Sequence, residues 1–204
     1  MLLNIHTHRP CPEGEQTIPA FGLHPWNVAV DWETRLSEAF ASFPSEEPDG
    51  HPASFFIGEC GLDRLCDAPY TLQLQAFEAQ IAFSNRLARP LILHCVRALD
   101  DVLRLHHHAT QPWIWHGFRG KPELLAQLVR AGFYISFGWR YNPESLLACP
   151  AHRLFLETDD GPETIAPLYR QVAVERATTV EALATQTWHN LLTLTAKRKI
   201  YVKR

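Results

Sequence analysis

Histidine and carboxylate side chains stand directly after short apolar runs at several places in this chain. Neutral imidazoles and carboxylates are the groups that bind Zn²⁺, Mn²⁺ and similar first-row divalent ions in proteins. The pattern therefore predicts a divalent-metal site, with one or two ions (Zn, Mn, Mg or similar) as cofactor. The residues expected to form it are His6, His8, Glu59, His94, His116 and Asp159.

Each of these residues also has an ordinary explanation when it is taken alone. A pair such as His6-Thr7-His8 is often only a surface or core feature. A carboxylate at the end of a strand can simply cap the next helix. Several polar strand ends at one pole would, however, be costly to bury unless they were paired or bound to metal. The combination therefore favours a metal site.

The elements that must position these side chains form an alternating series. Near-continuous apolar runs flanked by Gly, Pro or Asp are typical of buried parallel strands. Segments with the spacing of amphipathic helices lie between them and predict an α/β fold with a parallel sheet. The expected strands are 2–5, 18–23, 54–57, 91–93, 113–115, 133–137 and 154–156. The expected helices are 32–43, 72–88, 98–108, 122–131, 163–176 and 180–199.

Strand geometry explains how the predicted ligands could meet. In a parallel barrel, every strand delivers its carboxyl end to the same face, where active sites are built. His6 and His8 are two positions apart, so both can point to the same side of their strand. We expect one domain over residues 1–204, and a mobile surface loop over Pro44–Pro52.

Composition narrows the possible functions. A formal net charge of -3 does not indicate general affinity for nucleic acid or membrane. The five cysteines are scattered and form no C-x-x-C pair, which argues against a disulfide framework or a zinc knuckle. No apolar stretch is long enough for a membrane span or resembles a signal peptide. We therefore expect a cytoplasmic protein with no membrane association and no evident protein partner.

The chemical motifs, in their order along the chain, also match a known family. They are H-x-H at 6–8, G-L-H-P at 22–25, I-G-E-C-G-L-D at 57–63, L-H-C at 93–95, H-G-F-R-G at 116–120, I-S-F-G at 135–138 and L-E-T-D at 156–159. This order resembles the TatD-like metal-dependent hydrolases of the amidohydrolase superfamily. The resemblance runs from about residue 4 to residue 160.

The resemblance implies a TIM-type parallel β/α barrel with a two-metal site. His6, His8 and Asp159 would bind one ion, and His94 and His116 would bind the second ion. Glu59 would bridge the two ions. It further implies a phosphodiesterase, most plausibly a 3′-end deoxyribonuclease that uses a metal-activated water. Asp159 would accept the proton of that water. The alternative is a metal-dependent hydrolase of a small ester, amide or lactone, because fold and ligands do not separate these substrates.

Two departures from the family pattern concern the barrel and the substrate. Family members usually have eight strands, whereas here the segment after His8 leads directly into 18–23, so we expect a shortened barrel of seven strands. After Asp159 the family usually continues through a longer basic loop. Here Asp160–Glu163 leads almost directly into a helix, which leaves the substrate open.

Further residues near the predicted site are candidates for substrate contact, with DNA ends or a small phosphoester as the expected partner. His24 could contact substrate or cap a helix, and Arg119 could hold a phosphate oxygen or lie on the surface. Trp139 could stack on a base or sugar, and Trp26 could do the same or form a hydrophobic lid. Asp63 is expected to orient Glu59 or to cap a helix.

Other histidines and cysteines are expected to have structural roles. The run His106–His108 closes a predicted helix, where a solvated face is expected. Cys60 and Cys95 directly follow predicted ligands, so strand alternation points them toward the helix layer as core thiols.

Overall fold

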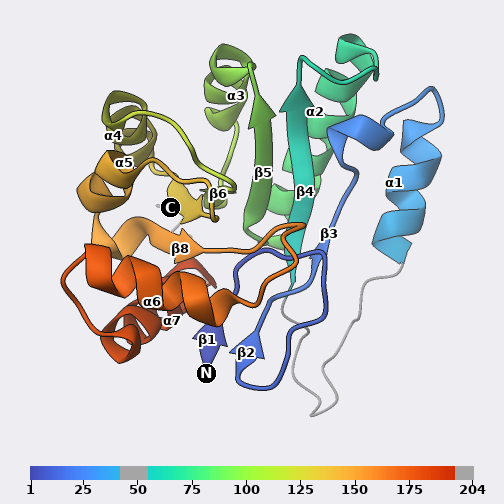
Figure 1. The fold of residues 1–204 in the computed structure, drawn as a ribbon. Helices are drawn as coiled ribbons and strands as arrows, with labels where there is room; N and C mark the ends of the chain where they lie inside the picture. The colour runs from blue at the N-terminus through green and yellow to red at the C-terminus, as the bar shows by residue number, and fades with distance from the viewer. Residues whose placement is uncertain (42–54, 196–204) are drawn as a thin grey trace, which may run out of the picture.

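A computed structural model describes residues 1–41 and 55–195 of the chain. Within these residues, parallel strands alternate with helices as expected, and the helices lie around the outside of the strands (Figure 1). The strands are β1 (Leu2–Leu3), β2 (Glu15–Gln16), β3 (Ala20–Phe21), β4 (Phe56–Asp63), β5 (Leu91–Val96), β6 (Trp113–Trp115), β7 (Tyr134–Phe137) and β8 (Leu154–Leu156).

The strands form a ring in chain order. β3 to β8 make a six-stranded parallel sheet, and β1 pairs in parallel with β2. β2 and β3 belong to one segment and are separated by 17–19. On the other side, Ile5 N donates to Leu156 O at 3.0 Å, and Thr7 forms a parallel bridge with Asp159. β1 therefore closes the α/β barrel between β2 and β8.

The expected count of seven strands is not confirmed, because the described residues contain eight assigned strands. The predicted strand 18–23 is present only as β3, and β2 precedes it. β2 consists of two polar residues, Glu15 and Gln16, so no apolar pattern indicated it. Backbone pairing with Leu2 and Leu3 holds this strand in place.

Six helices agree with the expected segments to within a few residues where the structure describes them, and the helix over Pro143–Ala148 was not among the expected segments. The described helices are α1 (Trp32–Ala41), α2 (Tyr70–Leu87), α3 (Leu99–His106), α4 (Pro122–Ala131), α5 (Pro143–Ala148), α6 (Ile165–Glu175) and α7 (Val180–Thr195), with short 3₁₀ turns η1 (Pro25–Asn27) and η2 (Ala151–Arg153). Pro122 and Pro143 begin α4 and α5, where a missing N–H costs nothing. The predicted loop 44–52 and the end of the predicted helix 180–199 lie outside the described residues.

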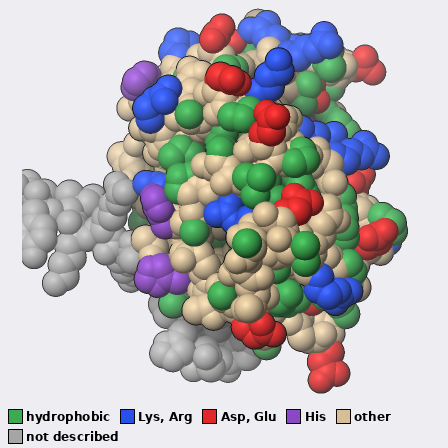
Figure 2. All heavy atoms as spheres, turned by 60° about the vertical axis from the view of Figure 1, so that its left-hand side comes forward, with side chains coloured by type: hydrophobic (Ala, Val, Ile, Leu, Met, Phe, Trp, Pro, Cys, Tyr) green, Lys and Arg blue, Asp and Glu red, His purple; other side chains and the backbone are tan. Residues whose placement is uncertain are grey.

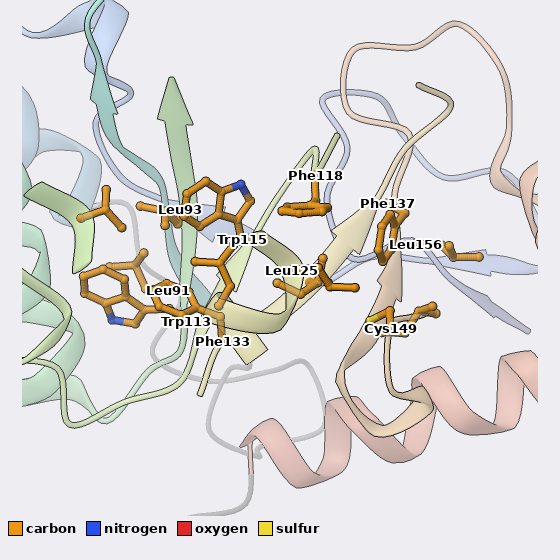
Figure 3. Close-up of a cluster of buried hydrophobic side chains, with 14 of the residues drawn as sticks. Leu91, Leu93, Trp113, Trp115, Phe118, Leu125, Phe133, Phe137, Cys149 and Leu156 are labelled. Carbon is orange, nitrogen blue, oxygen red and sulfur yellow. The ribbon is translucent and has the colours of Figure 1, made fainter. Parts of the chain in front are cut away.

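Side chains pack in two layers, inside and outside the ring of strands. Alternate residues such as Leu91, Leu93, Trp113 and Trp115 face the helices, in the cluster of Figure 3. The positions between them fill the barrel interior together with Leu191 and Leu194 of α7. These inward residues are Leu3, Ile5, Phe56, Ile92, Ile114, Tyr134 and Phe155. α7 therefore supplies apolar side chains to the barrel interior.

β4 is longer than expected. The sequence predicted a strand over 54–57, but β4 extends to Asp63, so Glu59 lies within the strand and not at its tip; Ser54 is outside the described residues. Gly61 pairs with His94 of β5 and has a φ of +147°. A Cβ at Gly61 would lie 1.9 Å from the His94 carbonyl oxygen, so only glycine fits there. This close approach keeps Glu59 and His94 on neighbouring strands.

The outer surface has mixed charge. On the face in Figure 2, Lys and Arg side chains are interspersed with Asp and Glu, in keeping with the small net charge of -3. Within residues 1–41 and 55–195, no helix is both long and apolar enough to cross a membrane.

Candidate metal centre

The predicted ligands gather around one buried carboxylate at the carboxyl ends of the strands. Glu59 of β4 has a side chain that is only 6% exposed. Its Oε2 atom lies 3.0 Å from Nε2 of His6 and 3.5 Å from Nε2 of His8. Both histidines lie on the extension of the chain beyond β1, as the H-x-H spacing predicted.

The other carboxylate oxygen of Glu59 faces a second group of imidazoles. Oε1 lies 2.7 Å from Nδ1 of His94 and 2.7 Å from Nε2 of His116. Nε2 of His24 is 3.2 Å from the same oxygen. The two oxygens of Glu59 therefore face two separate sets of nitrogen atoms.

Asp159 completes the first set through backbone pairing between the ends of β1 and β8. His8 N donates to Asp159 O at 3.0 Å, and Asp159 N donates to His6 O at 3.2 Å. This places the Asp159 carboxylate 3.7 Å from His6 Nε2 and 3.5 Å from His8 Nε2. Asp159 has a φ of 54°, a left-handed conformation that Asp tolerates better than most residues.

Hydrogen bonds between Asn4 and Thr158, both buried, also join the ends of β1 and β8. Asn4 Nδ2 donates to Thr158 Oγ1 at 2.8 Å, and Thr158 N donates to Asn4 Oδ1 at 3.1 Å. Thr158 Oγ1 also donates to Thr7 Oγ1 at 3.1 Å. These bonds hold the ends of β1 and β8 together, so they fix His6 and His8 relative to Asp159.

The imidazoles decide the charge state of Glu59. Burial alone would raise the pKa of the Glu59 carboxyl, but hydrogen bonds from His116, His24, His6 and His8 hold that pKa well below its usual range. The hydrogen bond to Glu59 in turn raises the pKa of His8. Glu59 is therefore a carboxylate, the form that binds a divalent ion.

Glu157 is a site residue whose role the sequence did not indicate. It directly follows β8, is fully buried, and accepts a hydrogen bond from Gly117 N at 2.6 Å. The same Oε1 atom lies 3.3 Å from Nδ1 of His116. Burial alone would raise the pKa of Glu157, but the neighbouring His116 lowers it. The available signal was a carboxylate directly after a fully apolar strand, and Glu157 was noted only as part of the L-E-T-D motif.

Asp63 differs from expectation. Among the described residues, the Asp63 carboxylate forms no hydrogen bond with Glu59 or with a helix N-terminus. Instead Oδ2 accepts from Trp26 Nε1 at 2.6 Å and lies 3.3 Å from Nε2 of His94, while Oδ1 accepts from Leu65 N at 2.8 Å. Because β4 continues to Asp63, this carboxylate reaches the far side of the His94 ring.

The structure also places the predicted substrate residues. Arg119 and Trp139 line a cleft of about 930 Å³ that reaches His94, His116 and Asp159. His24 has two contacts: it caps η1 by accepting from Trp26 N at 3.2 Å, and it lies beside Glu59. A smaller space of about 340 Å³ adjoins the side of the site that holds His6.

Arginine and carboxylate side chains both line the large cleft. Three exposed arginines line it, and none of their guanidinium groups has an ion-pair or hydrogen-bond partner in the described part of the chain: Arg97, Arg119 and Arg140. The carboxylates that also line this cleft are Glu157, Asp159, Asp160 and Glu163. Unpaired guanidinium groups beside a metal-type site favour an anionic substrate.

One expectation about structural residues was wrong for one of its three histidines, since His107 and His108 are exposed as expected. His106 does not lie on a solvated face, because its ring stacks on Phe133 at 4.2 Å and packs against Trp113 at 4.9 Å. Burial correspondingly lowers the pKa of His106. Cys60 is buried in the outer core and Cys95 packs against that core, as expected.

The donor set fits divalent cations. One atom from each of His6, His8, Glu59 and Asp159 lies within 4.8 Å of the others, and the same holds for His24, Glu59 and His94. Imidazole nitrogens mixed with carboxylate oxygens suit Zn²⁺, Mn²⁺ and related ions. His24 therefore shares the geometry of the second set, whereas the sequence indicated a substrate contact or a helix cap.

Related proteins match most of the chain in sequence. The 3′-5′ ssDNA/RNA exonuclease TatD of Klebsiella pneumoniae (strain 342) is 34% identical over 155 residues, which are 68% of this chain but 55% of that protein. The uncharacterized metal-dependent hydrolase YabD of Bacillus subtilis (strain 168) is 28% identical over 195 residues, 84% of this chain and 74% of that protein. The chain thus matches only about half the length of the first relative.

Solved structures and a family model agree with the fold. A TatD-family hydrolase from Entamoeba histolytica superposes with a TM-score of 0.70 at 14% identity, over 88% of this chain and 75% of that one. The family model described as TatD related DNase matches residues 11–196, a range that begins after His6 and His8. The chain belongs to the TatD-related DNase family.

Proposed function

We propose that this protein is a divalent-metal-dependent phosphodiesterase that shortens single-stranded DNA from its 3′ end. The observation that supports this most strongly is that the two carboxylate oxygens of Glu59 face different histidines. Oε2 faces His6 and His8, and Oε1 faces His94 and His116. A carboxylate arranged in this way is suited to bridging two ions.

In this proposal His6, His8 and Asp159 hold one ion, His94 and His116 hold the other, and Glu59 contacts both. Bound there, divalent ions would lower the pKa of a water and neutralise charge on a phosphoryl group. Asp159 has a side chain that is 30% exposed, so it is the ligand best placed to accept the proton of an attacking water. His24 lies beside Oε1 and helps to keep Glu59 in its carboxylate form.

The chain's own residues would also orient the substrate. The guanidinium groups of Arg97, Arg119 and Arg140 line the large cleft and can bind phosphate oxygens of the strand. Because the net charge is only -3, these local arginines must supply the attraction for a polyanion. A few local arginines and a small net charge suit binding of the end of a single strand better than binding along a long duplex.

The names of two relatives support the proposed nuclease activity. One is named a 3′-5′ ssDNA/RNA exonuclease and the other an uncharacterized metal-dependent hydrolase. A second candidate is hydrolysis of a small phosphoester, carboxylic ester, amide or lactone. The short connection Asp160–Glu163 between β8 and α6 favours it, because this connection lines the cleft with two carboxylates and no basic side chain. Action as one domain over 1–204 and a cytoplasmic location stay predictions.

The test is digestion of a 3′-labelled and a 5′-labelled single-stranded oligodeoxynucleotide after chelation and separate re-addition of Mg²⁺, Mn²⁺ or Zn²⁺. Metal-dependent shortening from the 3′ end, lost in Asp159→Asn, is the expected result. No cleavage with any ion, while elemental analysis shows bound metal, would contradict the nuclease and favour the small-molecule hydrolase. A rate that falls steeply with salt would show that several phosphates are contacted.

A further inference from the structure

Trp26 is a large apolar side chain left exposed at the mouth of the candidate centre. It belongs to η1, is 64% exposed, and lines the same cleft as His94 and His116. Trp139 also lines this cleft but is half-buried, and its indole N–H has no partner among the described residues. An exposed tryptophan facing a cleft is an unfavourable use of apolar surface unless something covers it.

The indole of Trp26 is nevertheless held in a fixed position. Its Nε1–H donates to Oδ2 of Asp63 at 2.6 Å, and Asp63 is only 3% exposed. Asp63 Oδ2 also lies 3.3 Å from Nε2 of His94, so one carboxylate orients both rings. The Trp26 ring stands nearly perpendicular to His24, with centroids 4.9 Å apart and an interplanar angle of 84°.

These contacts leave most of an immobilised aromatic surface open beside the reacting centre. Base–aromatic stacking needs such a surface, and a ring that is already ordered loses little conformational entropy when a base covers it. A simple lid would instead be expected to move and to exclude water from any substrate alike.

We propose that Trp26 is a specificity-determining residue that stacks on a nucleobase next to the scissile phosphodiester, with Asp63 as its positioning residue. This inference rests on the proposed function and names the part of the substrate that the site recognises. It predicts that the protein discriminates between a strand end that carries its base and one that does not.

The experiment compares kcat/KM on single-stranded oligodeoxynucleotides whose terminal or penultimate 3′ nucleotide is either intact or abasic. Trp26→Ala is expected to reduce the preference for the intact end by about 5- to 150-fold, the range that stacking of one base provides. Leu65→Ala is the matched control. Leu65 is 61% exposed and is bound to Asp63 through its backbone N–H, but it does not line the cleft.

Unchanged discrimination in Trp26→Ala at both positions would overturn the proposal, as would equal losses on intact and abasic ends, which a lid would produce. Trp26→Leu repeats the test with apolar bulk but no aromatic face, and it should show the same loss of preference. A wild-type protein that cleaves neither oligonucleotide with metal bound would refute the nuclease function itself. An active wild type with an unchanged Trp26→Ala preference would refute only the stacking role.

Discussion

Removal of Glu157 should weaken metal binding although this carboxylate does not face the ions directly. Oε1 of Glu157 lies 3.3 Å from His116 Nδ1, and Nε2 of the same ring lies 2.7 Å from Glu59 Oε1. A carboxylate next to Nδ1 keeps the proton on that nitrogen, which leaves the lone pair of Nε2 free for an ion. Glu157 therefore sets both the orientation and the tautomer of His116.

The magnitude follows from what Glu157→Ala leaves behind. Loss of an outer partner of a metal-binding histidine typically weakens metal affinity about 10- to 100-fold. In the chelated protein, Gly117 N–H and the His116 ring lose their buried acceptor, since Glu157 is 0% exposed. Breaking such a buried pair costs about 3–5 kcal/mol, or a fall in Tm of about 6–20 °C for a chain of this size.

The assay is chelator competition for Zn²⁺ or Mn²⁺, with the Tm of chelated protein measured in parallel. Glu157→Gln should keep affinity within a few-fold, because its amide oxygen can accept both hydrogen bonds and Oε2 of Glu157 has no hydrogen-bond partner among the described residues. Glu175→Ala is the control: it removes the acceptor of Tyr141 Oη at 2.6 Å, away from the centre, and should leave metal affinity unchanged. Wild-type metal affinity in Glu157→Ala would refute the reasoning.

Three further predictions concern the reaction, the fold and the thiols. Asp159→Asn should lower the rate of metal-dependent hydrolysis by about 10²- to 10⁴-fold without changing the circular dichroism spectrum, and near-normal turnover would contradict its role as proton acceptor. Gly61→Ala should reduce the free energy of unfolding by about 2–6 kcal/mol in urea titrations, because its Cβ would meet the His94 carbonyl. Gly132→Ala is its control: the φ there is +102° but nothing lies within 4 Å of the added Cβ, so only about 1–3 kcal/mol should be lost. Burial raises the pKa of Cys149 to about 12, so this thiol should resist iodoacetamide at pH 8 until denaturant is added, and rapid labelling seen by mass spectrometry in native protein would contradict that burial.

The chemistry at the strand ends could be predicted from the sequence because it depends on two local signals. An apolar run followed by His or Glu fixes where a parallel strand meets the active face, and this holds for His6, His94 and His116. The regular spacing of α2 and α4 was visible for the same reason, since one face of each helix is buried.

What the sequence did not show depends on contacts between distant segments. Gly58 and Gly61 looked like the end of a strand, yet β4 continues through both of them. Gly61 is a glycine because β5 comes too close to leave room for a Cβ there, and this contact is not visible in the sequence. His24 looked like a turn residue, and only the path of the chain after β3 brings it to Glu59. The pairing of β2 with β1 likewise follows from barrel closure and leaves no trace in the residue pattern.

The two halves of the candidate centre depend on the fold in different ways. Glu59, His94 and His116 come from β4, β5 and the end of β6, which are neighbours in one continuous sheet. Their spacing is therefore set by strand pairing and does not require a closed ring. His6, His8 and Asp159 meet only because β1 and β8 are joined by the hydrogen bond from Ile5 N to Leu156 O and by those between Asn4 and Thr158. No helix lies between β1 and β3 in the described residues, so both halves can be kept only if the segment after β1 reaches across the barrel to β4. Here the single segment that carries β2 and β3 does so, since it pairs with β1 at one end and with β4 at the other.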